Sequence, residues 1–276
     1  MLWGDRPDGT RLRGLAPMRQ VIPHLMPART GATVFFELRL DLTATLPWLQ
    51  MRSAAMGREV TLFHLLQYAL VRVLSEHPGL HRFVAGRALY QRRKLELSYV
   101  VKKRLDEAAP MTTVKVEFHP GDSLEAVVAK AGAAVLDGRG GRLLPSEREM
   151  AAFVQLPNWL LGALVALQRQ LDRWNLLPGA LTAQDPLYAS AFLANLGSIG
   201  LDAAYHHLYD WGTVPIFLVL GRVAPQVWAS EDGSAQVRTS VVLRCSVDER
   251  IGDGMAFASG LETLRRLVEH PERHAV

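Results

Sequence analysis

Apolar residues recur along this chain at the two spacings that distinguish strands from helices. Between Thr33 and Leu40, large apolar side chains alternate with other residues, which predicts a half-buried strand. From Thr61 to Ser75 the apolar residues follow helical spacing, and Pro78 stands just beyond as a stop signal. The pattern therefore predicts a strand followed by a helix whose apolar face lies in the core.

The same spacings predict further elements toward the C-terminus. Strands are expected at 95–101, 111–118, 188–194, 216–220, 226–229 and 236–247. An amphipathic helix is expected over 123–136, capped at Asp122 or Ser123. A closing helix is predicted over Met255–Glu269.

The segment 157–177 is predicted to be helical, with its apolar residues on one broad face. Such a face accepts an acyl chain or rests on a membrane surface, or it packs in the core or against another subunit. The apolar run Leu156–Leu167 is broken by Pro157 and Asn158 and is too short to cross a bilayer. The sequence pattern does not separate these alternatives.

Composition limits the classes of function. The chain has 276 residues, of which 49% are hydrophobic, and this is enough for the core of one large domain. Its 31 Lys and Arg against 27 Asp and Glu leave a net charge of +4, too small an excess for a nucleic-acid reader. The single cysteine, Cys245, excludes an internal disulfide framework. The N-terminus has no apolar run typical of a secretory signal, so a cytoplasmic location is expected.

Two short motifs carry the candidate chemistry. They are residues 248–254, DERIGDG, and residues 191–197, AFLANLG. Together they resemble the catalytic domain of the E2 dihydrolipoamide acyltransferases of 2-oxo acid dehydrogenase complexes, whose fold is shared with chloramphenicol acetyltransferase. That family carries Asp-His-Arg-x-x-Asp-Gly in the first place and Ile-Ser-Asn-Leu-Gly or a close variant in the second.

The resemblance extends over roughly residues 16–270, with weaker matches in the same order, such as Pro215–Gly221. It implies an α/β (α+β) two-layer sandwich, a chloramphenicol acetyltransferase-like mixed sheet with helices, and a homotrimer or a larger assembly of trimers. It divides the chain into an N-terminal arm, residues 1–15, and a single acyltransferase domain, residues 16–276. No lipoyl or peripheral-subunit-binding domain is expected.

The motifs depart from the family at the two residues that perform its chemistry. Glu249 stands where the family has its catalytic histidine, and Ala194 stands where it has the serine that donates to the oxyanion. A carboxylate with a pKa of about 4.3 is a weaker base than imidazole at neutral pH. Removal of one oxyanion donor costs about 2.7–4 kcal/mol of transition-state stabilisation. Asn195, Ser198 and Ser190 are the nearby polar residues that remain as substitutes.

The rest of the first motif is expected to hold the turn. By the resemblance, Asp248 and Arg250 form a structural ion pair. Asp253 is expected to cap the closing helix, because a carboxylate at a helix N-terminus accepts backbone hydrogen bonds. A direct catalytic role for Asp253 is the less favoured reading.

A replacement for the missing histidine lies between the two motifs, in the segment 205–211, YHHLYDW. His206 or His207 is a candidate relocated base, with Glu249 or Asp210 orienting its imidazole as in a catalytic triad. Adjacent histidines among aromatic residues are also common as packing or surface residues. No metal site is expected, because no third ligand has a diagnostic spacing.

Three functional hypotheses follow. The first is a divergent acyltransferase that moves an acyl group from a thioester to an acceptor, with CoA or a lipoyl group as co-substrate and no tightly bound cofactor. The second is an inactive E2-like pseudoenzyme that serves as a trimeric scaffold or ligand-binding protein. The third, a true E2 core, ranks last because its base and its oxyanion serine are missing. Segment 157–177 is the candidate for peripheral membrane contact.

Overall fold

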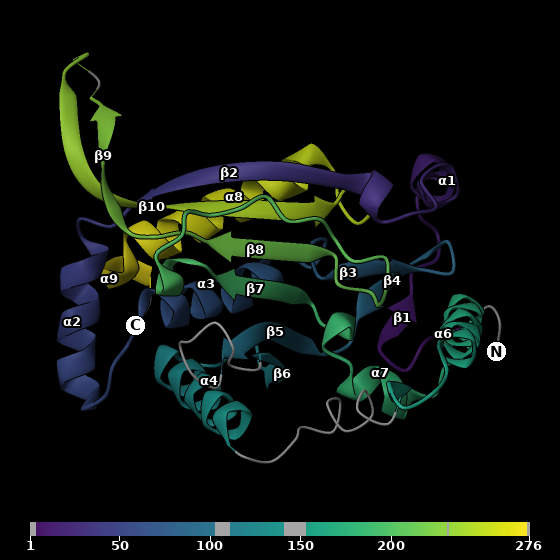
Figure 1. The fold of residues 1–276 in the computed structure, drawn as a ribbon. Helices are drawn as coiled ribbons and strands as arrows, with labels where there is room; N and C mark the ends of the chain where they lie inside the picture. Colours follow the sequence, from purple (N-terminus) through teal and green to yellow (C-terminus); the bar gives the residue numbers. More distant parts are fainter. Residues whose placement is uncertain (1–3, 103–110, 141–152, 231, 275–276) are drawn as a thin grey trace.

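The computed structural model describes residues 4–102, 111–140, 153–230 and 232–274. Its centre is a seven-stranded mixed sheet in the order β2-β10-β8-β7-β5-β6, with β9 paired to β10 (Figure 1). The bounds are β2 Thr33–Asp41, β5 Leu95–Lys102, β6 Met111–Phe118, β7 Ala191–Asn195, β8 Ile216–Leu220, β9 Ala224–Ala229 and β10 Ala235–Asp248. The pairs β5–β7 and β7–β8 are parallel, and the other pairs are antiparallel.

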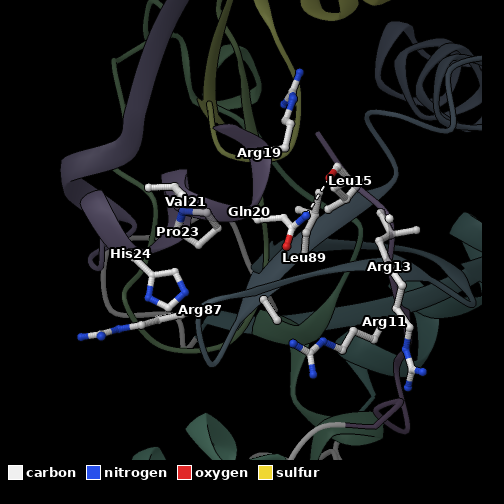
Figure 2. A pocket seen from close by; sticks show the side chains of 13 residues that line it. Arg11, Arg13, Leu15, Arg19, Gln20, Val21, Pro23, His24, Arg87 and Leu89 are labelled. Carbon is white, nitrogen blue, oxygen red and sulfur yellow. Dashed lines mark hydrogen bonds between the residues drawn. The ribbon is translucent and has the colours of Figure 1, made fainter. Parts of the chain in front are cut away.

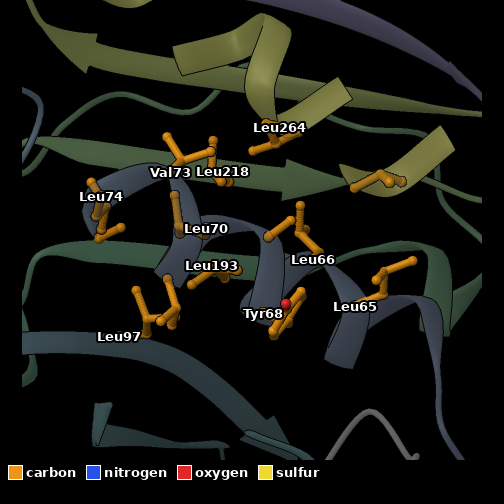
Figure 3. Close-up of a cluster of buried hydrophobic side chains, with 14 of the residues drawn as sticks. Leu65, Leu66, Tyr68, Leu70, Val73, Leu74, Leu97, Leu193, Leu218 and Leu264 are labelled. Carbon is orange, nitrogen blue, oxygen red and sulfur yellow. The ribbon is translucent and has the colours of Figure 1, made fainter. Parts of the chain in front are cut away.

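Helices cover one face of this sheet and enclose the main core. They are α2 Thr45–Met56, α3 Leu62–Glu76, α4 Leu124–Arg139, α8 Gly254–Glu269 and α9 Pro271–His274. In Figure 3, Leu66 and Leu70 of α3 lie among Leu193 of β7, Leu218 of β8 and Leu264 of α8. Burial of this apolar surface is the main favourable contribution to folding. The predicted two-layer α/β sandwich with a mixed sheet is confirmed.

The opposite face of β7 and β8 has a smaller core of its own. Side chains alternate along a strand, so Phe192 and Phe217 point away from the helices. Their rings are stacked, with centroids 4.9 Å apart. The segment 200–214 crosses this face, and Leu208 from it is fully buried in the cluster. We call this side of the sheet the loop face.

Most of the predicted elements are confirmed, with shifts at their ends. Helix α3 begins after Thr61, whose hydroxyl accepts a hydrogen bond from the backbone N–H of His64. The hydroxyl of Ser123 caps α4 in the same way. Strand β7 begins later than predicted, because Pro186–Tyr188 form a 3₁₀ turn. The predicted helix over 157–177 ends early as α6, Asn158–Arg173, and the left-handed Asn175 follows it.

The N-terminal segment is more structured than the predicted extended arm. Residues Gly9–Arg11 form β1, which pairs with β4, Ala88–Arg92, beside β3, Arg82–Ala85. The side chain of Arg6 is buried, and it contacts the carboxylates of Asp8 and Asp172. A helix, α1 Pro17–Leu25, follows. The sequence did not reveal this three-stranded sheet because strands this short show no readable alternation and their partners are distant in sequence.

Helix α6 lies on the surface, and none of its residues is buried. Trp159 is 75% exposed and Leu167 is 55% exposed, so of the alternatives that the pattern left open, packing of this face in the core of a single chain is excluded. The short helix α7, Gly179–Gln184, follows it. Among the described residues, no helix is both long and apolar enough to cross a membrane.

Candidate functional site

The turn after β10 is held by a buried ion pair. The guanidinium of Arg250 donates through Nε to Oδ1 and through Nη2 to Oδ2 of Asp248, both at 2.7 Å. Asp248 is fully buried, and Nε of Arg29 lies 3.7 Å from its Oδ2. Nη1 of Arg250 also donates to the carbonyl oxygen of Met26 at 2.8 Å. This bidentate pair joins the turn to the start of the chain.

Asp253 caps helix α8. Its Oδ1 accepts a hydrogen bond from the backbone N–H of Ala256 at 2.9 Å, and its Oδ2 accepts one from Nη2 of Arg19 at 2.8 Å. The backbone hydrogen bond from Ala256 and the nearby charge of Arg19 lower the pKa of this exposed carboxyl. Both oxygens of Asp253 are therefore engaged in structure.

Glu249 is positioned by its backbone, whose N–H donates to the carbonyl oxygen of Ala32 at 3.0 Å. Its half-buried side chain has no hydrogen bond or ion pair within the described part of the chain. The guanidinium of its neighbour Arg250 is turned to Asp248 instead. Glu249 is thus a carboxylate with no group that orients it.

The turn at Ala194 is closed by its own polar side chains. Asn195 Oδ1 accepts from the backbone N–H of Ser198 at 3.1 Å, and the Ser198 hydroxyl donates to the carbonyl oxygen of Asn195 at 2.7 Å. A Cβ on Gly197 would lie 2.3 Å from the carbonyl oxygen of Gly221, so only glycine fits this close approach. The side-chain NH₂ of Asn195 is the donor that remains without a partner among the described residues.

Ser190 lies apart from this turn and is buried. Its hydroxyl is 2.9 Å from Nε2 of His81 and also accepts the backbone N–H of Glu96 at 3.1 Å. Ser190 is therefore committed to the start of β5 and is no substitute for the missing oxyanion donor.

The two motifs do not meet within one chain. Ala194 lies opposite Val219, and Val219 lies opposite Arg244 on β10. Glu249 is five residues beyond Arg244, which corresponds to about 17 Å along an extended strand. Strand β8 also lies between β7, which carries Ala194, and β10, which leads to Glu249. A site that uses both positions therefore needs two copies of the chain.

His206 lies on the loop face, on top of Phe217. The two rings are parallel within 6° and their centroids are 4.0 Å apart. The hydroxyl of Ser246 on β10 donates to the backbone carbonyl of His206. On its other side the ring stacks against His207, at a centroid distance of 4.9 Å. This half-buried imidazole is held between a strand and an exposed ring.

The contacts of His206 define its protonation. Its Nδ1 lies 2.7 Å from the carbonyl oxygen of His207, and because a carbonyl only accepts, Nδ1 carries the proton. Burial lowers the pKa of His206, which keeps the ring neutral at pH 7. Nε2 is then an unprotonated acceptor with no hydrogen bond within the described residues. His207 is exposed, and its Nδ1 lies 3.1 Å from the carbonyl oxygen of Leu208.

Neither carboxylate expected behind the imidazole is there. Oδ1 of Asp210 accepts hydrogen bonds from the backbone N–H and the hydroxyl of Thr30, at 3.4 and 3.3 Å. Glu249 contacts neither histidine. Backbone carbonyl groups orient both rings instead. No group of three or more His, Cys, Asp or Glu within the described ranges is arranged to hold a metal ion.

The sequence reading missed Arg29 and Phe217. Arg29 is buried and donates through Nη1 to the carbonyl oxygen of Tyr209 at 2.7 Å and through Nη2 to that of Gly212 at 2.8 Å. It therefore joins the histidine segment to the buried Asp248. Burial lowers the pKa of its guanidinium. No local signal marks Arg29, whereas Phe217 lies in a strand that the sequence did predict.

A mixed sheet with helices on one face, together with the turn held by Asp248 and Arg250 that leads into α8, defines the chloramphenicol acetyltransferase-like fold. The model of the 2-oxoacid dehydrogenases acyltransferase (catalytic domain) family matches residues 176–276. The resemblance to this family that the motifs predicted is therefore confirmed. No curated protein matches the chain by sequence.

Solved structures share the fold over nearly the whole chain. A probable dihydrolipoamide acetyltransferase from Listeria monocytogenes is 15% identical, with a TM-score of 0.62, and the match covers 95% of both chains. The cubic core of a pyruvate dehydrogenase multienzyme complex is 16% identical, with a TM-score of 0.59, over 96% of this chain and 94% of that one. A chloramphenicol acetyltransferase is 11% identical, with a TM-score of 0.57, over 94% and 99%.

Proposed function

We propose that this protein is an acyltransferase that moves an acyl group from a thioester, of CoA or of a lipoyl group, to an acceptor thiol or hydroxyl. The observation that carries the proposal is the state of His206, a neutral imidazole whose Nδ1–H is bound to a carbonyl and whose Nε2 is unoccupied. A general base requires an unprotonated nitrogen that is free to accept a proton, and Nε2 of His206 meets this requirement. The fold and the family match over residues 176–276 are consistent with this chemistry.

The reaction proceeds in two steps. Nε2 of His206 takes the proton of the acceptor thiol or hydroxyl, and the acceptor attacks the carbonyl carbon of the thioester. The carbonyl oxygen carries the negative charge of the tetrahedral intermediate. Collapse re-forms the carbonyl and breaks the bond to sulfur, and the imidazolium returns its proton to the leaving thiolate. The acyl group ends on the acceptor and no other reactant is consumed.

The NH₂ group of Asn195 is the best available donor to the oxyanion. It lies next to Ala194, and its own carbonyl is already used by Ser198. A donor of this kind contributes only when it is aimed at the position of the oxyanion. Asn195 is therefore assigned the role that serine has in the family.

The site is proposed to lie between copies in a homotrimer. His206 lies on Phe217, which pairs with Phe192, and Asn195 is three residues farther along β7, about 10 Å away along the strand, so one copy does not bring the base and the oxyanion donor together. The similar cubic core belongs to a multienzyme complex. In this arrangement the exposed face of α6 is available for contact with a second subunit or with lipid.

The alternative function is a scaffold or ligand-binding protein without turnover. The observation that favours it is the unsupported carboxylate of Glu249 together with the methyl group of Ala194, neither of which offers the chemistry of the family residue it replaces. This alternative requires assembly but no role for His206.

The test is release of free CoA, quantified by chromatography, from donors that range from acetyl-CoA to long-chain acyl-CoA, in the presence of thiol or hydroxyl acceptors. His206→Ala is expected to lower the rate at least about 100-fold, the usual contribution of a general base. His207→Ala is the matched control, because it removes the neighbouring ring and is expected to retain most of the activity. Because the pKa of His206 is lowered, the rate should stay constant near neutral pH and fall only when the pH drops below the ordinary pKa of histidine.

Equal losses in the two variants would contradict the assignment to His206. If the wild-type protein releases no CoA from any donor and still forms trimers, the scaffold alternative is correct.

A further inference from the structure

A pocket of about 660 Å³ lies between α1, β1 and the start of β4, and His206 is not among the residues that line it. Among the described residues, no acidic side chain lines it. Its charged or titratable lining residues are Arg11, Arg13, Arg19, Arg87 and His24. In Figure 2, Arg11 and Arg13 lie on one side of Leu89, and His24 and Arg87 lie on the other. A second cavity of about 480 Å³ shares Arg11, Arg87 and His24 with the first.

The positive charge of this pocket is only partly neutralised. Arg19 points away from the other arginines in Figure 2 and binds Asp253. Arg13 and Arg87 have no hydrogen bond or ion pair among the residues that the structure describes. Like charges gathered in a concave site repel one another unless an anion binds between them.

Arginine is an unusual residue type for the turn position that Arg87 occupies. Gly86 and Arg87 form the two-residue turn between β3 and β4, with φ angles of 54° and 63°. Turns with two positive φ angles favour glycine or asparagine, and a long side chain there is strained. Only glycine fits at position 86, because a Cβ there would lie 2.3 Å from the carbonyl oxygen of Arg173. Position 87 has no such restriction and nevertheless carries an arginine, which points to a role for its charge.

The chemistry of the lining suggests the ligand. Guanidinium groups present paired N–H donors that match phosphate oxygens, and several of them around one site suit a group with more than one negative charge. Leu12, Leu15 and Leu89 add an apolar wall that suits a flat or apolar body. The volume lies in the range of pockets that hold small organic ligands.

We propose that this pocket binds an organic diphosphate of the nucleoside diphosphate class, with Arg13 and Arg87 contacting the phosphates. The site is separate from the His206 site and does not rest on the proposed acyl transfer. Its test measures binding and needs no activity.

The experiment is a titration of the whole chain with ADP. Binding is measured by isothermal titration calorimetry at low and at physiological salt. Micromolar binding that weakens with salt is expected. Arg87→Gly and Arg13→Gln should each lower the affinity at least tenfold. Arg87→Gly also supplies the residue that the turn favours, so its melting temperature should not fall, and loss of binding would not reflect unfolding. Arg139→Gln, an exposed arginine at the end of α4, is the charge-matched control and should bind like the wild type.

A parallel arm uses vesicles containing phosphatidic acid, whose phosphate headgroup presents similar chemistry at a membrane. Binding to these vesicles without binding of ADP would overturn the proposal of a soluble ligand. Absence of ADP binding, or equal affinity of Arg87→Gly, Arg13→Gln and Arg139→Gln, would overturn the site itself.

Discussion

At the scale of single residues, His206 owes its chemical state to two neighbours. Phe217 beneath the ring removes water from one side and lowers the pKa, and the carbonyl of His207 selects the tautomer. Neither effect requires a carboxylate. The hydrogen bond to the backbone carbonyl orients the imidazole and raises its pKa, but by less than burial lowers it.

His81 leads to a prediction about stability and pH. Burial, and then the charge of Arg92, lower its pKa from 6.5 to about 4. Between these two pH values the unfolded chain binds a proton that the folded chain does not. The contribution of His81 to the free energy of unfolding is therefore fully present above pH 6.5. It is lost as the pH decreases, by roughly 3 kcal/mol at pH 4.

Urea unfolding of the wild type and of His81→Gln at pH 7 and pH 4.5 checks this prediction. The variant should lose less stability between the two pH values than the wild type, because Gln does not titrate. Identical losses would mean that other groups, such as the half-buried His64, whose pKa is also lowered by burial, account for the whole effect.

At the scale of elements, helix α3 is the main support of the sheet, and its start depends on a reciprocal cap. The hydroxyl of Thr61 accepts the backbone N–H of His64 at 3.3 Å, and Nδ1 of His64 accepts the backbone N–H of Thr61 at 3.1 Å. Burial lowers the pKa of His64, which keeps this nitrogen unprotonated at neutral pH. The pair satisfies two donors that the helix itself leaves open.

Thr61→Ala should lower the free energy of unfolding by about 1 kcal/mol, because one of these donors loses its acceptor. Thr61→Ser keeps the hydroxyl and should retain most of the stability. Denaturant unfolding at pH 7 measures both. Equal stability of the alanine and serine variants would show that the cap contributes nothing.

At the scale of the whole molecule, the loop face exposes aromatic surface beside His206. Phe35 on the edge strand β2 is 48% exposed, and its ring meets Tyr205 edge-on at a centroid distance of 5.7 Å. Tyr205 is itself 53% exposed. An exposed aromatic patch on an edge strand is typical of a contact surface between chains.

Phe35→Glu should therefore convert the proposed trimer into monomers that remain folded, because a carboxylate at this contact would be desolvated without a partner. Light scattering after size-exclusion chromatography measures the mass, and circular dichroism confirms folding. Leu136→Glu on α4, where the side chain is 72% exposed, is the control and should leave the mass unchanged. A Phe35→Glu protein with the mass of the wild type would place the contact elsewhere.

The sequence determined what depends on near neighbours in the chain. The alternation that predicts β2, the cap and apolar face of α3 and the DxR turn at 248–250 are all local, so composition and spacing suffice to find them. The sequence did not predict the strands β1, β3 and β4, because each is only 3 to 5 residues long and is defined by its pairing with distant residues.

Only the tertiary structure decided how distant segments meet. It placed His206 on Phe217 and Arg29 beside Asp248, and it separated Ala194 from Glu249 along the sheet. It also gathered Arg11, Arg19 and Arg87 around one pocket. These contacts join residues far apart in the chain, so no local pattern encodes them. The pKa of an imidazole and the charge of a pocket arise from that packing, because burial and neighbouring charges set both.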